Sequence, residues 1–159
     1  MPQNLVALFR YNRWATRQLI EFCARLTDVQ LDATMDGVYG SIRATLEHLV
    51  GAEERYTVLL TGGGWQPAPV ASTGLTGLAE RAGACGTALL DVAAQDQTEH
   101  ILRGERRGEP YVLPALVPLS QAIHHANDHR SQIATLLTHQ GIEPPDLDVW
   151  AYHDAGMPD

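Results

Sequence analysis

The segment 116–140 constrains the fold most strongly, because its apolar residues repeat with the period of an α-helix. Pro118 suits the first turn of a helix, where no backbone N–H is needed, and Gly141 suits the residue after its end. At about 3.6 residues per turn, one stripe gathers the apolar side chains Leu119, Ala122, Ala126, Ile133, Leu136 and Leu137. Such a stripe must be covered by other elements of the chain.

Two histidines, His125 and His129, fall inside this stripe at positions i and i+4. Side chains with this spacing lie side by side on one helical face, so two imidazoles can bind one metal ion. The ordinary alternative is a pair of core histidines, although two buried rings need two sets of hydrogen-bond partners. The spacing leaves both interpretations open, and a third ligand from another helix would favour the metal.

Three further segments carry apolar stripes of helical period: 4–26, 41–60 and 75–94. Ser41 suits the N-cap of the second. Because four amphipathic helices bury their stripes best against one another, the sequence predicts an all-α four-helix bundle in a single domain spanning residues 1–159.

The connections between these helices carry turn-forming residues. The link 61–74, rich in glycine and proline, is long enough for a crossover; it is either an ordinary connection or a mobile lid carrying Trp65. Segments 98–103 and 111–113 are predicted as the strands of a small β-hairpin before the last helix, around a turn at 104–108. The tail 142–159 is expected to pack back on the bundle through its apolar residues Leu147, Val149, Trp150 and Tyr152.

Some residues stand out against these stripes. Asn12 lies within one, so it needs a hydrogen-bond partner: either a structural bond between helices or a role beside a ligand. Glu53 is either solvated near a helix end or a buried acid with a raised pKa. His48 lies on the flank of its stripe, where it is either half-exposed or a ligand reaching toward a neighbouring helix. Trp14, on the outer face among arginines, needs cover from a loop or a second subunit.

The charge balance excludes some classes of partner. The chain has 11 Lys and Arg against 19 Asp and Glu, a net charge of -8, which argues against nucleic acid and anionic membrane as partners. Cys23 and Cys85 fall on apolar stripes and are expected to be buried free thiols. With no signal-peptide pattern and no apolar run of membrane-spanning length, a cytoplasmic protein is expected.

Three stretches together resemble a known family. They are Tyr11-Asn12-Arg13-Trp14-Ala15, the pair of motifs Ser41 to His48 and Gly51-Ala-Glu53, and His125 to Ile133. In order and spacing they are similar to the DinB-like family of metal-binding four-helix bundles, which is related to the YfiT-like metal-dependent hydrolases. Ser131 stands where the family frequently has glycine, at a position off the core stripe.

The resemblance implies a metal triad of one histidine from the second helix and an H-x-x-x-H pair from the last, which here are His48, His125 and His129. Relatives carry nickel, zinc or another divalent ion, are often homodimers, and include S-transferases that use a low-molecular-weight thiol. His100, His124, His139 and His153 are expected not to be ligands.

Three neutral imidazoles leave coordination positions open for water or a small-molecule substrate. One hypothesis is therefore a metal-dependent enzyme of the thiol S-transferase or hydrolase type. The alternative is a non-catalytic metal-bound bundle that binds a small molecule or a protein partner. A third, a DNA-repair factor, conflicts with the net charge of -8. In either metal-bound case, each ligand ring is expected to donate its other N–H to a carbonyl, a water or a carboxylate.

Overall fold

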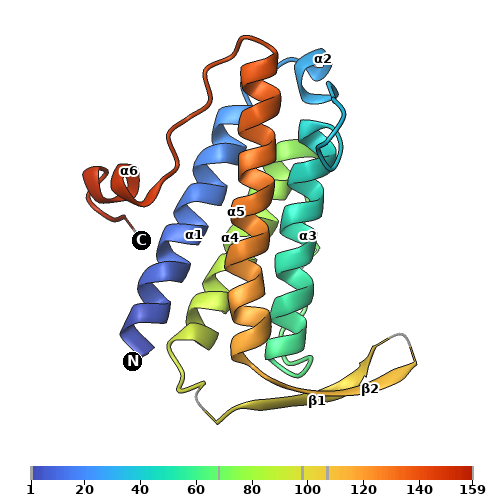
Figure 1. Cartoon of the computed structure of the whole chain (residues 1–159), viewed down its shortest axis with the longest axis vertical. Helices are drawn as coiled ribbons and strands as arrows, with labels where there is room; N and C mark the ends of the chain where they lie inside the picture. The colour runs from blue at the N-terminus through green and yellow to red at the C-terminus, as the bar shows by residue number, and fades with distance from the viewer. Residues whose placement is uncertain (1, 68, 98, 107, 159) are drawn as a thin grey trace.

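The computed structural model describes residues 2–67, 69–97, 99–106 and 108–158. Four long helices form a bundle, as predicted (Figure 1): α1 (Pro2–Cys23), α3 (Ile42–Leu60), α4 (Gly74–Ala93) and α5 (Leu116–His139). Two short helices, α2 (Asp28–Leu31) and α6 (Val149–Asp154), lie in the link after α1 and in the C-terminal tail. No helix in these described ranges is long and apolar enough to cross a membrane.

The directions of the helices follow from two apolar clusters, one at each end of the bundle. The upper cluster joins the ends of α1 and α5 to the starts of α3 and α4; its members include Leu19, Ile20, Leu46, Leu49, Leu78, Ile133 and Leu137. The lower cluster joins the opposite ends of the same helices; its members include Phe9, Leu60, Leu89, Val92, Leu119 and Ala122. Hence α1 and α5 run one way while α3 and α4 run the other (Figure 1).

Because α3 and α4 are parallel, the link between them has to return along the length of the bundle, a crossover that its length allows. Trp65 in this link packs against the lower cluster, and its backbone N–H donates to Thr61 Oγ1 at 3.1 Å. These contacts favour an ordinary connection over a mobile lid.

Local capping explains where two helices begin. Ser41 is the N-cap of α3, as predicted, and its hydroxyl accepts a hydrogen bond from the Ala44 N–H at 3.2 Å. Thr27 and Gln30 form a capping box at the start of α2. Arg43, near the start of α3, pairs with Asp28 and Asp32 at 2.7 Å each and ties the link to the bundle.

The hairpin consists of β1 (Ile101–Arg106) and β2 (Glu109–Pro114), paired antiparallel, and it extends from the end of the bundle opposite α2 (Figure 1). The prediction of a hairpin is confirmed, but the predicted turn at 104–108 is wrong, because the strands continue to the pair Arg106 and Glu109. Gly104 is a strand residue that leaves room for the ring of its partner Tyr111. Thr98, in the predicted first strand, lies outside the described residues.

The C-terminal tail packs against α1 only in part. Tyr152 is buried, with its ring centroid 5.3 Å from that of Trp14, and Leu147 accepts a hydrogen bond from the Tyr11 hydroxyl at 2.9 Å. Val149 and Trp150 are 56% and 76% exposed, so the expectation that they pack on the bundle is wrong. The tail of the same chain covers Trp14. Of the two kinds of cover expected from the sequence, a loop or a second subunit, the structure shows the loop.

Candidate metal centre

Three histidine side chains from two helices meet at one point on the bundle. His48 extends from α3 and His125 and His129 from α5, two helices that pack side by side. The Nε2 atom of His125 lies 3.1 Å from Nε2 of His48 and 3.2 Å from Nε2 of His129. The three ligand atoms lie within 4.8 Å of one another, and no other His, Cys, Asp or Glu among the described residues joins this group.

The arrangement fits a divalent cation. Two nitrogens bound about 2.1 Å from one ion lie about 3.4 Å apart in tetrahedral geometry and about 3.0 Å apart in octahedral geometry. The measured separations of 3.1 and 3.2 Å fall between these values. A neutral ring presents either one hydrogen or one lone pair at Nε2, so His125 Nε2 cannot make a full hydrogen bond to both neighbours. One cation accepts the lone pairs of all three.

The surroundings of His48 and His125 favour the neutral form of these two rings. Burial, together with the nearby His129, His48 and Arg55, lowers the pKa of His125 to about 4. Burial also lowers the pKa of His48, helped by His129 and Arg55. Because only a neutral imidazole can donate a lone pair to a metal, these shifts keep the ligand atoms available at neutral pH.

Two tyrosines border the histidine cluster. The Tyr39 ring stacks on His48 with centroids 4.0 Å apart and meets His129 edge-on at 5.3 Å, while Tyr56 lies edge-on to His125 at 6.1 Å. The Tyr39 backbone N–H donates to Gln132 Oε1 at 2.9 Å, which ties the link before α3 to α5. Sequence reasoning missed Tyr39, because a residue in a link carries no periodic signal.

Two ring nitrogens that face away from the cluster differ from the expectation for their hydrogen bonds. Nδ1 of His125 and Nδ1 of His129 are buried, and no protein atom of the described chain is their hydrogen-bond partner. The backbone around both rings is helical, so its carbonyls are already bonded within α5. No carbonyl or carboxylate of the described chain therefore holds these nitrogens, and of the three expected partners a water is the one that stays a prediction.

A buried polar network also crosses the bundle. Asn12 on α1 donates from Nδ2 to Glu53 Oε1 at 2.6 Å and accepts at Oδ1 from Arg130 Nη1 at 2.9 Å. The same Arg130 nitrogen donates to Thr16 Oγ1 at 3.0 Å. For Asn12, the structural bond between helices is thus present.

Glu53 in this network is only 2% exposed, so the solvated alternative is wrong and the buried-acid alternative is confirmed. Burial raises its pKa to about 7, while the Asn12 hydrogen bond and the Arg130 charge partly oppose the rise. Arg130 is 4% exposed and was missed by sequence reasoning. The signal was present, because Arg130 follows Ala126 by four positions and precedes Ile133 by three, on the apolar stripe.

The remaining candidates lie apart from the centre. Cys23 and Cys85 are buried free thiols, as predicted, and burial raises the pKa of each to about 12, so neither is a ready nucleophile. Cys85 Sγ lies 3.1 Å from Thr57 Oγ1. The four histidines expected to be non-ligands are exposed and outside the group: His100, His124, His139 and His153.

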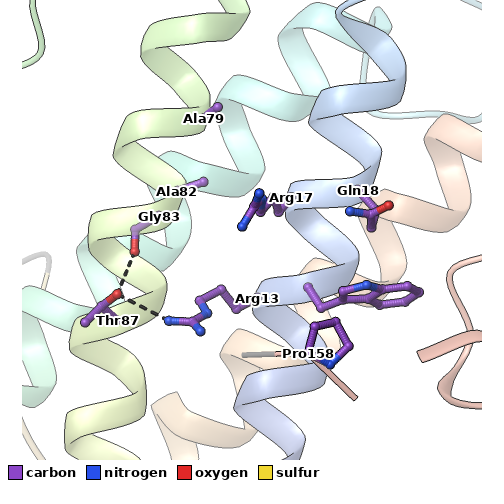
Figure 2. Close-up of a pocket in the computed structure, with 9 residues that line it drawn as sticks. Arg13, Arg17, Gln18, Ala79, Ala82, Gly83, Thr87 and Pro158 are labelled. Atoms are coloured by element: carbon purple, nitrogen blue, oxygen red, sulfur yellow. Dashed lines mark hydrogen bonds between the residues drawn. The ribbon is translucent and has the colours of Figure 1, made fainter. Parts of the chain in front are cut away.

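A pocket of about 480 Å³ opens between α1 and α4, and none of the three histidines lines it. Figure 2 shows Arg13 and Arg17 extending from α1 toward the small residues Ala79, Ala82 and Gly83 of α4. Arg13 reaches Thr87 Oγ1 at 3.4 Å, and Arg17 pairs with Glu21 at 2.7 Å. This pocket is therefore separate from the histidine cluster, which lies between α3 and α5.

Together, the fold and the histidine cluster define a class: helical bundles with a three-histidine cluster compatible with a divalent metal ion. A family model described as the DinB family matches residues 1–159, the whole chain, so the chain belongs to the DinB family. No curated protein matches the chain.

Proposed function

We propose that this protein binds one divalent metal ion through His48, His125 and His129 and uses it as an open catalytic site. The convergence of three Nε2 atoms carries the proposal, with His125 Nε2 in contact with both of the others at 3.1 and 3.2 Å. When bound, the ion supplies Lewis acidity, lowering the pKa of a water or thiol at the site. Nickel and zinc are the metals we propose, because imidazole nitrogen suits both.

The reaction type we propose is a thiol S-transferase or a hydrolase, with a small-molecule substrate and, for the transferase, a low-molecular-weight thiol as co-substrate. Three protein ligands leave at least one coordination position for an exchangeable group. His48 and His125 are only partly buried, so this position can be reached from solvent. The rings of Tyr39 and Tyr56 border the site and offer apolar surface to the organic part of a substrate.

A second candidate function is a non-catalytic metal-bound bundle that binds a small molecule or a protein partner. Its support is the lack of a general base: within the described ranges, no carboxylate belongs to the histidine group. The carboxyl group of Glu53, a buried acid on α3, is engaged by Asn12 in the buried network.

The assembly and the compartment are also proposals. We propose a homodimer on the resemblance alone, since the tail of the same chain covers Trp14 and removes the structural motive. Light scattering that finds only monomer at micromolar concentration contradicts it. Two unpaired buried thiols support a reducing compartment, and we propose the cytoplasm.

Metal analysis of five single variants tests the site. His48→Ala, His125→Ala and His129→Ala should each weaken zinc or nickel binding by at least about a hundredfold, because two imidazoles hold a divalent ion far less well than three. His124→Ala and His139→Ala are the matched controls and should bind as the parent does. Retention of metal by His125→Ala together with its loss from His124→Ala would contradict the site.

Turnover of the metal-loaded protein separates the two candidate functions. A panel of low-molecular-weight thiols with electrophilic acceptors, and a panel of ester and amide substrates, should show turnover that His125→Ala lacks. A protein that binds metal stoichiometrically but turns over neither panel favours the non-catalytic bundle.

A further inference from the structure

The side chain of Asn12 joins the two helices that carry the histidines, although its own helix supplies none of them. Its Nδ2 donates to Glu53 of α3 at 2.6 Å, and its Oδ1 accepts from Arg130 of α5 at 2.9 Å. Asn12, Glu53 and Arg130 are 2%, 2% and 4% exposed, so water does not compete for these bonds.

Both partners of Asn12 lie close in sequence to the histidines. Arg130 directly follows His129, and Glu53 lies five positions after His48 on the same helix. One residue of slip along a helix turns a side chain by about 100° and moves it by about 1.5 Å. A slip of that size in α3 or α5 would break a bond of Asn12 as well as the meeting of the three rings.

The donor and acceptor pattern allows only one orientation of the amide. The guanidinium of Arg130 can only donate, so it requires the oxygen of Asn12. At about pH 8, above the pKa of about 7 of Glu53, the carboxylate can only accept, so it requires the nitrogen. Among the other side chains, none combines a donor and an acceptor in the same compact shape as asparagine. The bridge is therefore specific to this residue type.

No protein hydrogen bond holds two of the rings, because Nδ1 of His125 and of His129 have no protein partner in the described chain. In most metal sites, hydrogen bonds to the ligand rings hold them in place. Here the protein's own hydrogen bonds hold the two helices that carry the rings, through Asn12. We propose that Asn12 is a positioning residue of the metal centre, which sets the rotation and register of α3 against α5; the inference rests on the proposed metal function.

Reversal of the bridge's polarity tests the inference. Asn12→Asp places a carboxylate against Glu53 and should lower zinc affinity by about 10- to 100-fold, the range typical of groups that position metal ligands. Adding Glu53→Gln restores a donor facing an acceptor, since the introduced glutamine amide donates to the introduced aspartate, which also accepts from Arg130. The double variant should return to within about threefold of the parent, a coupling that only interacting residues show.

The matched control is Thr16→Val, which removes another hydrogen bond of Arg130 without touching the bridge. It should lower the stability of the metal-free protein and leave zinc affinity within about threefold of the parent, because the bridge between α3 and α5 is intact. Affinity is measured by chelator competition at about pH 8, and the ligand geometry by the visible spectrum of the cobalt-loaded protein. Asn12→Ala replaces Asn12→Asp if the latter does not fold, with the same loss of at least about tenfold expected.

The outcomes separate this inference from the proposed function. A parent protein that binds no zinc, nickel or cobalt overturns the proposed function and the inference with it. A parent that binds metal while folded Asn12→Asp binds within about threefold of it overturns the inference alone. The inference also fails if folded Asn12→Asp loses affinity and Glu53→Gln does not restore it, or if Thr16→Val loses as much affinity as Asn12→Asp.

Discussion

The histidine cluster and the Asn12–Glu53–Arg130 network both connect α3 to α5, but their side chains are partnered differently. In the network, opposite charges meet through an amide, with a buried donor facing a buried acceptor at 2.6 and 2.9 Å. In the cluster, three like groups direct the same atom toward one another at 3.1 and 3.2 Å. The network stabilises the fold by contacts already present, although Arg130 Nη2 has no hydrogen-bond partner in the described chain, whereas under the proposed function the cluster gains its partner only when a cation is added.

The largest expected effect comes from breaking the network. Arg130→Met leaves the buried Glu53 carboxyl without its countercharge and Asn12 without a donor. Leaving a buried acceptor without its donor costs about 1–3 kcal/mol, and Arg130→Met does this at Asn12 Oδ1 and Thr16 Oγ1, so the free energy of unfolding of the metal-free protein should fall by about 2–5 kcal/mol. Urea denaturation measures it. A loss below about 1 kcal/mol would show that the network contributes little to the fold.

Changes in the histidine cluster should cost little stability without metal and should matter only when metal is added. In metal-free protein, the double variant His125→Leu, His129→Leu should stay within about 1 kcal/mol of the parent, because it removes two buried Nδ1 atoms that have no protein partner. With zinc at about 100 times its dissociation constant, the parent should gain about 2.7 kcal/mol and the variant nothing. Thermal melts with and without zinc check this. A variant that gains as much as the parent would place the metal elsewhere.

In the metal-free protein, the network and the cluster should change the free energy of unfolding in opposite directions as pH rises. The pKa of Glu53 is raised from 4.5 to about 7, so its contribution to stability is complete below 4.5 and is lost as pH rises through 7. The pKa of His125 is lowered from 6.5 to about 4, so its contribution is complete above 6.5 and is lost as pH falls through 4.

Glu53→Gln should therefore gain stability relative to the parent as pH rises from about 5 to 8, by about 1–3 kcal/mol, because glutamine has no proton to release. The measurement is urea denaturation of both proteins across this range. Glu53→Gln that tracks the parent at every pH would show that Glu53 is ionised at its usual pKa.

The smallest effect is expected at the edge of the cluster. Tyr39 is 53% exposed and stacks on His48, so Tyr39→Ala should leave the fold unchanged and loosen one ligand ring. A stacked aromatic pair contributes about 0.5–1.5 kcal/mol, which corresponds to about a 2- to 12-fold loss of zinc affinity. Tyr39→Phe is the matched control and should bind zinc as the parent does. Equal losses in both variants would point to the hydroxyl instead of the ring.

The sequence by itself determined the features that depend on neighbouring residues. Helical period gave the four long helices, and the Ser41 cap gave the start of α3. The i, i+4 spacing placed His125 and His129 on one face, and the resemblance added His48 to the set that the structure brings together. The helical period, the cap and the i, i+4 spacing are each contained within a few turns of one helix, where local geometry decides the outcome.

Only the tertiary structure decided what these helices meet. Arg130 and Asn12 are 118 positions apart in the chain, and no periodic pattern tells which helix faces which. The same stripe that marks Glu53 as buried does not show that Asn12 and the Arg130 charge stabilise it there. The cover on Trp14 likewise depends on Tyr152, near the other end of the chain. A stripe shows which face of a helix is buried; the residues that meet that face are fixed by packing between distant segments.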